Sequence, residues 1–559
     1  MLASTSKTIY RPTVHRVLPR FISSSTPEEW DVVIVGGGPA GLALASALGS
    51  SKLVRESLRV SLVEASDLSK VHEWSPVAGT FSNRASSLTH KSQAFLKDIR
   101  AWEHVDEGRT CPIQDMQVWD GISDARIEFS ASLLGTPGHG MARMTENLNL
   151  QRGLLRHLAN IPQVQILDKS RVQSIDLAEG SSWPLVRLDN GRVLRSRLLV
   201  GADGFNSPVR SFAKISSFGW AYDTQAIVST MNHPPRGAFM GPNTTAYQRF
   251  LPTGPIAFLP ISPMASSLVW STKPPLATAL IASGPDVLGY MINAAFRLPD
   301  VSMRYLHNLI LDAHESGSPV TPPQIQTEIA WRERSHGIEE TSAYASAFID
   351  ATKQGIPPAD AESLPPIVTS LQPGTVASFP LRFNHTDSYL GDGQGGRTVL
   401  VGDAAHTVHP LAGQGLNLGL ADVECLSRCI QDALAHGGDV GSRTALLPYA
   451  QERYLENHKI MSVMDKLHKL YSTSFEPVVW ARSVGLEVVN EFDSVKTALM
   501  MEASGQNGRG TSVWDVTAKV VENFAATTDA VRIIGTGVSG MFGAGIQSIL
   551  KASSTSSRK

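Results

Sequence analysis

Cysteine is scarce in this chain of 559 residues, which contains only Cys111, Cys425 and Cys429. Three cysteines cannot form the disulfide framework of a small secreted protein, and a chain of this length does not need one. Cys425 and Cys429 lie four residues apart on a predicted helix and therefore share a face. Because no histidine or further cysteine accompanies them at metal-ligand spacing, we interpret them as buried packing residues and predict no metal site.

A strong net charge is also missing, because 49 lysines and arginines nearly balance 51 aspartates and glutamates. Nucleic-acid binding usually requires a clustered basic surface, so this balance argues against a nucleic-acid partner. The composition is 42% apolar and 18% charged. It is that of an ordinary globular protein with enough length for a large core.

A convincing membrane-spanning segment is absent as well. The best candidate, residues 533–550, carries no charge and is just long enough, but it contains five glycines and Gln547. Three interpretations remain open for it: a span, an interfacial or docking helix, and a packed tail. We predict that it contacts a membrane surface or a partner and does not span.

The first 27 residues lack acidic side chains. This segment contains Lys7, Arg11, Arg16 and Arg20 together with many hydroxyl groups. An arginine-rich, serine-rich and acid-poor N-terminus is typical of a mitochondrial transit peptide, and a disordered basic tail is the alternative. In both cases residues 1–27 do not belong to the predicted fold.

A glycine-rich turn follows the first predicted strand. The apolar run at 32–35 leads into this turn, and a helix of small residues follows it. In such a turn, backbone without a side chain permits a tight bend, a close approach to a pyrophosphate and close packing of helix on strand. Glu64 ends the next predicted strand, where an acid accepts hydrogen bonds from a ribose. The unit therefore predicts a dinucleotide site, whose turn comprises Gly36, Gly37, Gly38, Pro39, Ala40 and Gly41.

A second unusual stretch, LVGDAAHTVHPLAGQGLNLGLAD at 400–422, places an acid, a proline and Gly-Gln-Gly before a helix. An ordinary helix cap needs only one Ser, Thr, Asp or Asn, and such a cap is the alternative here. In FAD enzymes of this type, Asp403 held by Gly402 can accept a hydrogen bond from a ribityl hydroxyl. Pro410 then provides a flat apolar surface beside the isoalloxazine ring.

The helix that follows predicts how the reduced cofactor is stabilised. Its first N–H groups can point at N1 and O2 of the flavin ring, where the reduced form is anionic, and a helix N-terminus stabilises such a charge. We therefore predict FAD rather than NAD. The flavin-activating environment is assigned, without any acid or base, to Pro410, Gly413 and Gln414, and Gly415 completes the helix start.

Together these motifs resemble the class A flavoprotein monooxygenases, which have the para-hydroxybenzoate hydroxylase fold. The GxGxxG turn, GADGFNSPVR at 201–210 and GDAAHTVHP at 402–410 carry this resemblance. More narrowly, HPLAGQGLNLGLAD is similar to the ubiquinone-biosynthesis hydroxylases. YQRFLPTGPIAFLP at 247–260 and LYSTSFEPVVWARSVGL at 470–486 resemble their mitochondrial branch, the ring C5 hydroxylases. The similarity covers residues 30 to about 490.

The resemblance implies further cofactor contacts. Arg84 matches the arginine that reaches the FAD diphosphate, and Gln151 stands where the family places a ribityl-contacting residue, often an arginine. Asp203 and Gly204 belong to the second dinucleotide motif. His406 lies near the flavin by motif, with a capping or packing role as its alternative, and Asn417 completes the cofactor-binding set.

The sequence gives less specific evidence for the residues that contact the substrate. Arg249 and Phe250 are the candidates for the ring-binding end of the substrate site. A plain core strand with one exposed arginine is the alternative.

The predicted fold is α/β, with a Rossmann-type FAD-binding unit, an inserted antiparallel sheet that forms the substrate domain, and C-terminal helices. We expect an irregular insertion with surface loops at about 295–375, and a loop followed by a helix at 85–105. The predicted domains are a transit peptide at 1–27, FAD-binding parts at 28–215 and 381–490, the substrate domain at 216–380, and an extension at 491–559.

The resemblance also implies an activity and its partners. The chain is expected to hydroxylate the ring, at C5, of a polyprenylated 4-hydroxybenzoate intermediate of ubiquinone, using O2 through a C4a-hydroperoxyflavin. A ferredoxin with its reductase would donate electrons, within a multienzyme complex held peripherally on the matrix side of the mitochondrial inner membrane. The alternatives are a class A hydroxylase or epoxidase of another lipophilic substrate, and a flavin-binding scaffold without turnover.

Overall fold

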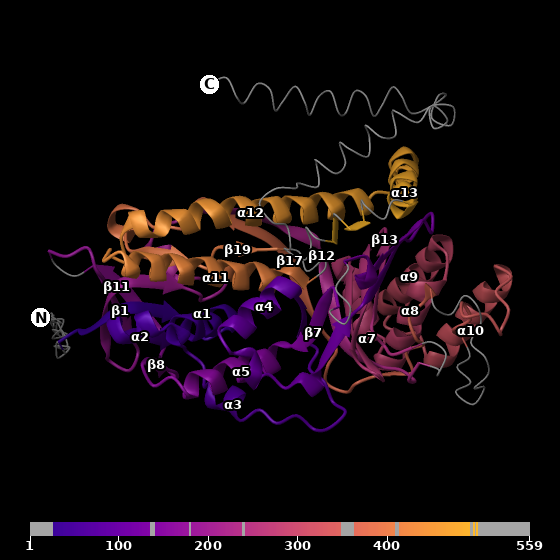
Figure 1. Ribbon diagram of the computed structural model, residues 1–559. Helices are drawn as coiled ribbons and strands as arrows, with labels where there is room; N and C mark the ends of the chain where they lie inside the picture. The colour runs from indigo at the N-terminus through magenta and orange to yellow at the C-terminus, as the bar shows by residue number, and fades with distance from the viewer. Residues whose placement is uncertain are drawn as a thin grey trace, which may run out of the picture.

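The computed structural model describes residues 26–134, 140–177, 180–236, 241–347, 363–408, 413–491, 496–497 and 499–500. The predicted transit peptide, apart from its last two residues, and the apolar segment at 533–550 lie outside these ranges. Within them the chain forms an α/β structure with three sheets, and none of their helices is long and apolar enough to cross a membrane (Figure 1).

The first sheet has seven strands in the order β8-β2-β1-β11-β10-β9, with β18 beside β11. Strands β8, β2, β1, β11 and β18 run parallel, so their carboxyl ends lie at one edge. Continuous apolar sequence, such as 32–35, suits strands that are covered on both faces. The strands are β1 (Glu28–Val35), β2 (Val60–Val63), β8 (Val164–Leu167), β9 (Val172–Leu177), β10 (Pro184–Leu188), β11 (Val193–Gly201) and β18 (Thr398–Leu400).

Helices pack on this sheet and on one another. All residues of α1 from 41 to 49 are buried, because its small side chains allow close packing on the sheet and on neighbouring helices. Cys425 and Cys429 are buried on α11, as predicted. These helices are α1 (Pro39–Ser50), α2 (Lys52–Ser57), α3 (Ser69–His72), α5 (Asn147–Ala159), α6 (Pro208–Phe212), α11 (Gln414–Ala435) and α12 (Arg443–Tyr471).

The second sheet has nine strands in the order β19-β17-β12-β15-β14-β13-β5-β6, with β16 beside β12. Its centre confirms the antiparallel sheet expected at 220–275. Trp119, Tyr247, Phe258 and Trp270 anchor its core. The strands are β5 (Asp115–Asp120), β6 (Arg126–Ser130), β12 (Ser217–Asn232), β13 (Thr245–Leu251), β14 (Gly254–Ser262), β15 (Ala265–Thr272), β16 (Ser370–Leu371), β17 (Ala377–Thr386) and β19 (His406–Thr407).

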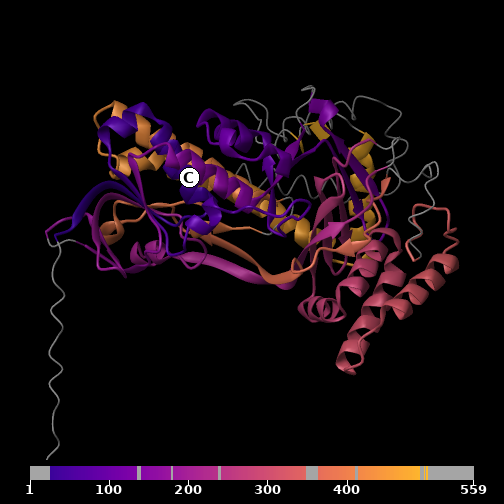
Figure 2. The same ribbon diagram turned by 90° about the horizontal axis from the view of Figure 1, so that it is seen from below.

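Four helices pack beside the second sheet, and two of them lie where the sequence predicted an irregular insertion (Figures 1 and 2). Residues 300–335 were expected to be irregular, yet they form two helices. Pro322 and Pro323 start a helix, where proline is well tolerated, and Thr321 and Gln324 form a capping box. The four helices are α7 (Pro274–Ala282), α8 (Pro285–Arg297), α9 (Asp300–Glu315) and α10 (Pro322–Ser335).

A small third sheet, of order β3-β7-β4, lies beside α11. The stretch at 85–105, expected to begin as a loop, begins as strand β3 and continues into a helix. The antiparallel partner of β3, β7, lies more than 50 residues away, so local sequence gives little sign of it. The remaining elements are β3 (Ala85–Thr89), β4 (Thr110–Ile113), β7 (Ala142–Glu146), α4 (His90–Asp98) and α13 (Glu476–Glu491).

One buried ion pair fastens α13 to the second sheet. Arg482 donates from Nε and Nη2 to the two carboxylate oxygens of Asp120, at 2.7 and 2.9 Å. Both side chains are almost completely buried. Removing one partner of such a pair leaves the other charge buried and unpaired, which costs about 3–5 kcal/mol.

We therefore predict that Arg482→Met lowers the free energy of unfolding by about 3–5 kcal/mol. The matched control, Arg187→Met, breaks the exposed pair with Asp176 and should cost less than about 1 kcal/mol. Chemical denaturation of both variants measures the difference. Equal losses would show that the buried pair does not fasten α13.

Candidate functional site

Three motifs that are far apart in the sequence meet at the carboxyl edge of the first sheet. Gly36 follows β1, Asp203 lies just after β11, and Gly402 lies just after β18. The Ala202 N–H donates to the Val35 carbonyl at 2.8 Å, and the Val401 N–H donates to the Gly201 carbonyl at 2.9 Å. Parallel strands thus bring the predicted cofactor motifs to one place, where α/β sheets commonly bind ligands.

The glycine turn fits a bound diphosphate. Gly36 has φ +114°, and a Cβ there would overlap the Ala202 carbonyl; a Cβ on Gly41 would overlap the Gly36 carbonyl. The protein itself therefore requires glycine at these two positions. Gly38 differs, because its φ is an ordinary −71° and no atom lies within 4 Å of a Cβ built there. The space in front of Gly38, at the N-terminus of α1, is open for a phosphate group.

Glu64 and Gln151 lie beside this turn. Glu64 Oε2 accepts a hydrogen bond from the Gly37 N–H at 2.5 Å, and Oε1 accepts from the Ser66 N–H at 2.7 Å. The Gln151 amide donates to the Gly37 carbonyl at 3.5 Å. Arg84 precedes β3 with an exposed side chain.

Two aspartates at this edge have carboxylates that the protein leaves incompletely satisfied. Asp203 Oδ2 accepts from the Val209 N–H at 3.1 Å, but Oδ1 is buried without a partner among the described residues. The Asp403 side chain is accessible yet surrounded by protein on most sides. Loss of water raises the pKa of both groups. Buried polar atoms normally have partners, so Asp203 Oδ1 fits a hydroxyl donor of a bound cofactor such as FAD, and the accessible Asp403 carboxylate is free to accept from another.

The start of α11 has the backbone conformation that was predicted from the stretch at 400–422. Gly413 precedes the helix with φ +61°, a left-handed conformation that favours glycine. Asn417 fixes this helix start, because its side chain accepts from the Thr89 N–H at 2.9 Å and donates to the carbonyls of Ser87 and Gly413. Both ends of the Asn417 amide are thus engaged by backbone. Pro410 lies outside the described residues.

One residue to which no role was assigned from sequence holds the stretch at 400–422 together. Asp422, on α11, accepts through Oδ2 from the Gly402 N–H at 3.1 Å and from His406 Nε2 at 2.7 Å. Its Oδ1 accepts from Arg453 Nε at 3.0 Å and from Asn457 at 2.9 Å. Burial alone would raise its pKa, but His406, Arg453 and Asn457 lower it to about 2. An acid on the apolar face of a predicted helix was the available signal.

His406 itself is buried and hydrogen-bonded to Asp422, which agrees with the packing role given above as its alternative. Its Nδ1 has no partner among the described residues. The predicted contact between His406 and the flavin stays a prediction.

The two substrate candidates lie elsewhere. Arg249 is buried, so the alternative of an exposed arginine is wrong. Its guanidinium donates to the carbonyls of Ala295 and Leu298 at 3.1 and 2.8 Å, which ties β13 to the end of α8. Phe250 stacks on Tyr471 with ring centroids 4.0 Å apart. None of these partners belongs to the three converging motifs.

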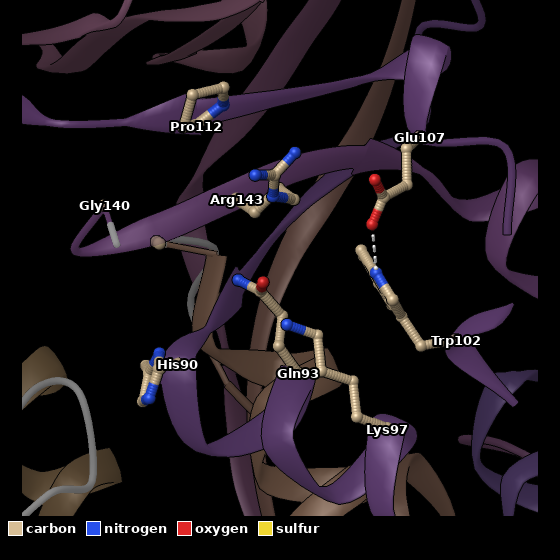
Figure 3. A pocket seen from close by; sticks show the side chains of 9 residues that line it. His90, Gln93, Lys97, Trp102, Glu107, Pro112, Gly140 and Arg143 are labelled. Atoms are coloured by element: carbon tan, nitrogen blue, oxygen red, sulfur yellow. Dashed lines mark hydrogen bonds between the residues drawn. The ribbon is translucent and has the colours of Figure 1, made fainter. Parts of the chain in front are cut away.

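A hollow of about 120 Å³ lies between α4 and the third sheet (Figure 3). Arg143 points into it, and Glu107 accepts a hydrogen bond from the Trp102 indole at its side. It contains none of the predicted site residues, so it is not the cofactor site. Its lining comprises His90, Gln93, Lys97, Trp102, Glu107, Pro112, Gly140, Ala142 and Arg143.

Comparison with known proteins defines the class first. Residues 29–276 and 283–462 match the family described as FAD binding domain. The p-nitrophenol 4-monooxygenase PnpA of Pseudomonas putida is similar with a TM-score of 0.58 and 16% identity, over 87% of this chain and 100% of that chain. PqsL of Pseudomonas aeruginosa, described as a probable FAD-dependent monooxygenase, is similar with a TM-score of 0.54 and 20% identity, over 82% of this chain and 99% of that chain. The fold is that of the class A flavin monooxygenases.

The sequence relatives are more specific. The ubiquinone biosynthesis monooxygenase COQ6 of Saccharomyces cerevisiae is 37% identical over 504 residues, or 88% of this chain and 97% of that protein. COQ6 of Schizosaccharomyces pombe is 35% identical over 88% and 95%, and human COQ6 is 33% identical over 87% and 94%. The chain belongs to this family of mitochondrial, FAD-dependent ubiquinone-biosynthesis monooxygenases. The predicted class, fold, cofactor and mitochondrial location are thereby confirmed.

We predict that Gly38→Val yields folded protein that lacks FAD, because the added side chain fills space that only the cofactor would occupy. Gly485→Val is the matched control, since a Cβ there also meets nothing within 4 Å. Flavin absorbance per mole of purified protein measures the outcome. A full flavin complement in Gly38→Val would contradict the assignment of the turn.

We predict opposite effects of Asp403→Asn on the two forms of the protein. Because burial raises the pKa of Asp403, its charge destabilises the flavin-free fold at neutral pH. The flavin-free variant should therefore melt higher than the flavin-free wild type at pH 7. That gain should vanish below about pH 4, where Asp403 is protonated in both the folded and the unfolded wild type. Thermal unfolding across pH tests both parts.

The same variant should bind FAD more weakly, by about 1.5–3 kcal/mol, because a charged acceptor is lost. Titration of the flavin-free protein with FAD measures this loss. Unchanged affinity would show that Asp403 does not contact the cofactor.

Proposed function

We propose that this chain hydroxylates, at C5, the aromatic ring of a polyprenylated 4-hydroxybenzoate intermediate in ubiquinone biosynthesis. The observation that carries the proposal is the similarity, over 88% of this chain and 97% of the relative, to a protein named ubiquinone biosynthesis monooxygenase. The resemblance of 470–486 to the mitochondrial ring C5 hydroxylases supports the position on the ring.

The residues of the chain bind and orient the cofactor in this proposal. When bound, FAD supplies the activation of O2 and the transfer of one oxygen atom. The α1 N-terminus at Gly38 would hold the diphosphate, and Glu64 would accept a hydrogen bond from the adenosine ribose. Asp203 and Asp403 would accept from cofactor hydroxyls, and the N–H groups that begin α11 would stabilise the negative charge that the ring gains on reduction.

Asp422 acts through its neighbours rather than on the cofactor. Its bond to the Gly402 N–H fixes the turn that presents Asp403, and its bonds to Arg453 and Asn457 join that turn to α12. A turn held by a buried charge keeps Asp403 in one position, which lowers the cost of ordering it when FAD binds.

The proposal includes partners. The substrate is lipophilic, O2 is the co-substrate, and a ferredoxin with its reductase donates electrons. The chain works in a multienzyme complex at the matrix face of the inner membrane, which it contacts peripherally. The mitochondrial names of the relatives support this location, and a membrane-dissolved prenyl chain requires access from a bilayer.

Replacement of the Saccharomyces cerevisiae relative tests the proposal. The chain should restore ubiquinone in yeast lacking that relative, and cells with an empty vector should accumulate a prenylated intermediate without the C5 hydroxyl, as mass spectrometry would show. No restoration by a flavin-loaded protein would favour another lipophilic substrate. Restoration by the flavin-free Gly38→Val would favour a scaffold without turnover.

We predict that Gly413→Asp lowers the reduction potential of the bound flavin. The added charge lies at the start of α11, where it opposes the negative charge of the reduced ring by about 1–2 kcal/mol. For a two-electron couple, 1.4 kcal/mol corresponds to about 30 mV, so the shift should reach tens of millivolts. Gly413→Asn is the matched control, because it has the same shape without the charge and also tolerates φ > 0.

Dye equilibration of both holoproteins measures these potentials. The expected result is a lower potential for Gly413→Asp than for Gly413→Asn. Equal potentials would show that the start of α11 does not face the flavin ring.

A further inference from the structure

A band of exposed aromatic, aliphatic and lysine side chains runs from β12 onto the outer side of α12. Figure 1 shows α12 lying along one face of the molecule, with α13 at its end. Trp220, Val463 and Leu470 are 42%, 51% and 38% exposed. We name this band the lysine–aromatic face, and it comprises Phe218, Trp220, Val463, Lys466, Lys469 and Leu470.

The lysine–aromatic face is continuous. Lys469 Nζ lies 5.0 Å from the centroid of the Trp220 ring, which joins the end of α12 to β12. Trp220 stacks on Phe383 with ring centroids 4.3 Å apart, and the Phe218 ring lies 6.4 Å from the same Phe383 ring. Val463, Lys466 and Leu470 follow one another at helical spacing and therefore share one side of α12.

The exposed charged side chains of this face are both lysines. Between residues 459 and 471 the sole acid is Asp465, which is buried and accepts from the Tyr222 hydroxyl at 3.0 Å and from Lys469 at 2.6 Å. The exposed acid on β12, Asp223, pairs with Lys273 at 3.0 Å. Among the described residues, no carboxylate lies within ion-pair distance of Lys466. Lys466 therefore carries a positive charge that no carboxylate among the described residues compensates, whereas the charge of Lys469 is paired with Asp465. The face as a whole has a net positive charge around its apolar side chains.

We propose that the lysine–aromatic face rests on an anionic lipid surface. This inference rests on the peripheral membrane contact proposed above and names the part of the chain that makes it. Anionic headgroups attract lysines near a bilayer, while half-exposed aromatic and aliphatic side chains enter the boundary between headgroups and acyl chains. The long lysine stems cover apolar surface while their amines stay in water.

The composition of the face favours lipid over a protein partner. Protein interfaces are enriched in aromatic residues and arginine but depleted in lysine, whereas this face has two lysines and no arginine. Indole rings are enriched where membranes meet water. The aromatic and basic members of the face therefore suit a bilayer together.

The location links membrane contact to the substrate domain. β12 continues from Trp220 into the second sheet, where it pairs with β15 and β17. The same long strand thus reaches from the lysine–aromatic face to the sheet that was predicted to bind the substrate. A lipid-facing β12 would keep that sheet close to a membrane-dissolved prenyl chain.

Co-sedimentation with vesicles tests the proposal on the full-length, FAD-loaded protein. The wild type should bind phosphatidylcholine vesicles that contain phosphatidylserine and should bind pure phosphatidylcholine weakly. Lys466→Glu should weaken binding to the anionic vesicles by about tenfold or more. Lys70→Glu, an equal change in net charge at an exposed site on α3, should leave binding unchanged. Flavin content confirms that both variants fold.

The outcomes separate two failures. If the wild type does not bind anionic vesicles, the peripheral contact itself is wrong, and this face with it. If Lys466→Glu binds as the wild type does, the contact exists but another surface makes it. Restoration of ubiquinone in yeast is a separate readout, so the proposed hydroxylation can stand in either case.

A label at Val463 distinguishes lipid from other occupants. The three native cysteines are buried, so an environment-sensitive fluorophore reacts with the new thiol of Val463→Cys. Its emission should shift to the blue when anionic vesicles are added, and a label at Lys70→Cys should not respond. If residues 501–559 or another protein cover the face instead, the emission is blue-shifted from the start and vesicles do not change it, which overturns the proposal.

Discussion

The buried carboxylate of Asp422 is the interaction on which the cofactor edge depends. A fully buried charge is tolerated only when every lone pair meets a donor, and here four donors surround it. Those donors come from the turn after β18, from β19 and from α12. Asp422 therefore joins the two ends of the stretch at 400–422 and fastens both to the longest helix among the described residues.

The parallel strands determine where the stretch at 400–422 lies. Strands β1, β11 and β18 are neighbours, so the backbone that follows each of them emerges at the same edge. The glycine turn supplies open space there, Asp203 supplies a buried oxygen without a partner among the described residues, and Asp403 supplies an accessible carboxylate.

Much of this edge could be predicted from sequence because its signals are local. A strand, three glycines and a small-residue helix specify the first turn, and the glycine before α11 specifies the second. The helices at 300–335 were not predicted, although Pro322 and Pro323 stand where proline commonly begins a helix. The role of Asp422 and the burial of Arg249 depend on partners from distant segments, which no local pattern contains.

FAD titration of the flavin-free protein carrying Asp422→Asn tests the account most directly. Asp432→Asn, the same substitution at an exposed site on the same helix, is the control. If Asp422 fixes the turn that presents Asp403, the first variant should bind FAD at least about tenfold more weakly, with its circular dichroism preserved, and the control should bind as the wild type does. Unchanged FAD affinity in Asp422→Asn would contradict the account.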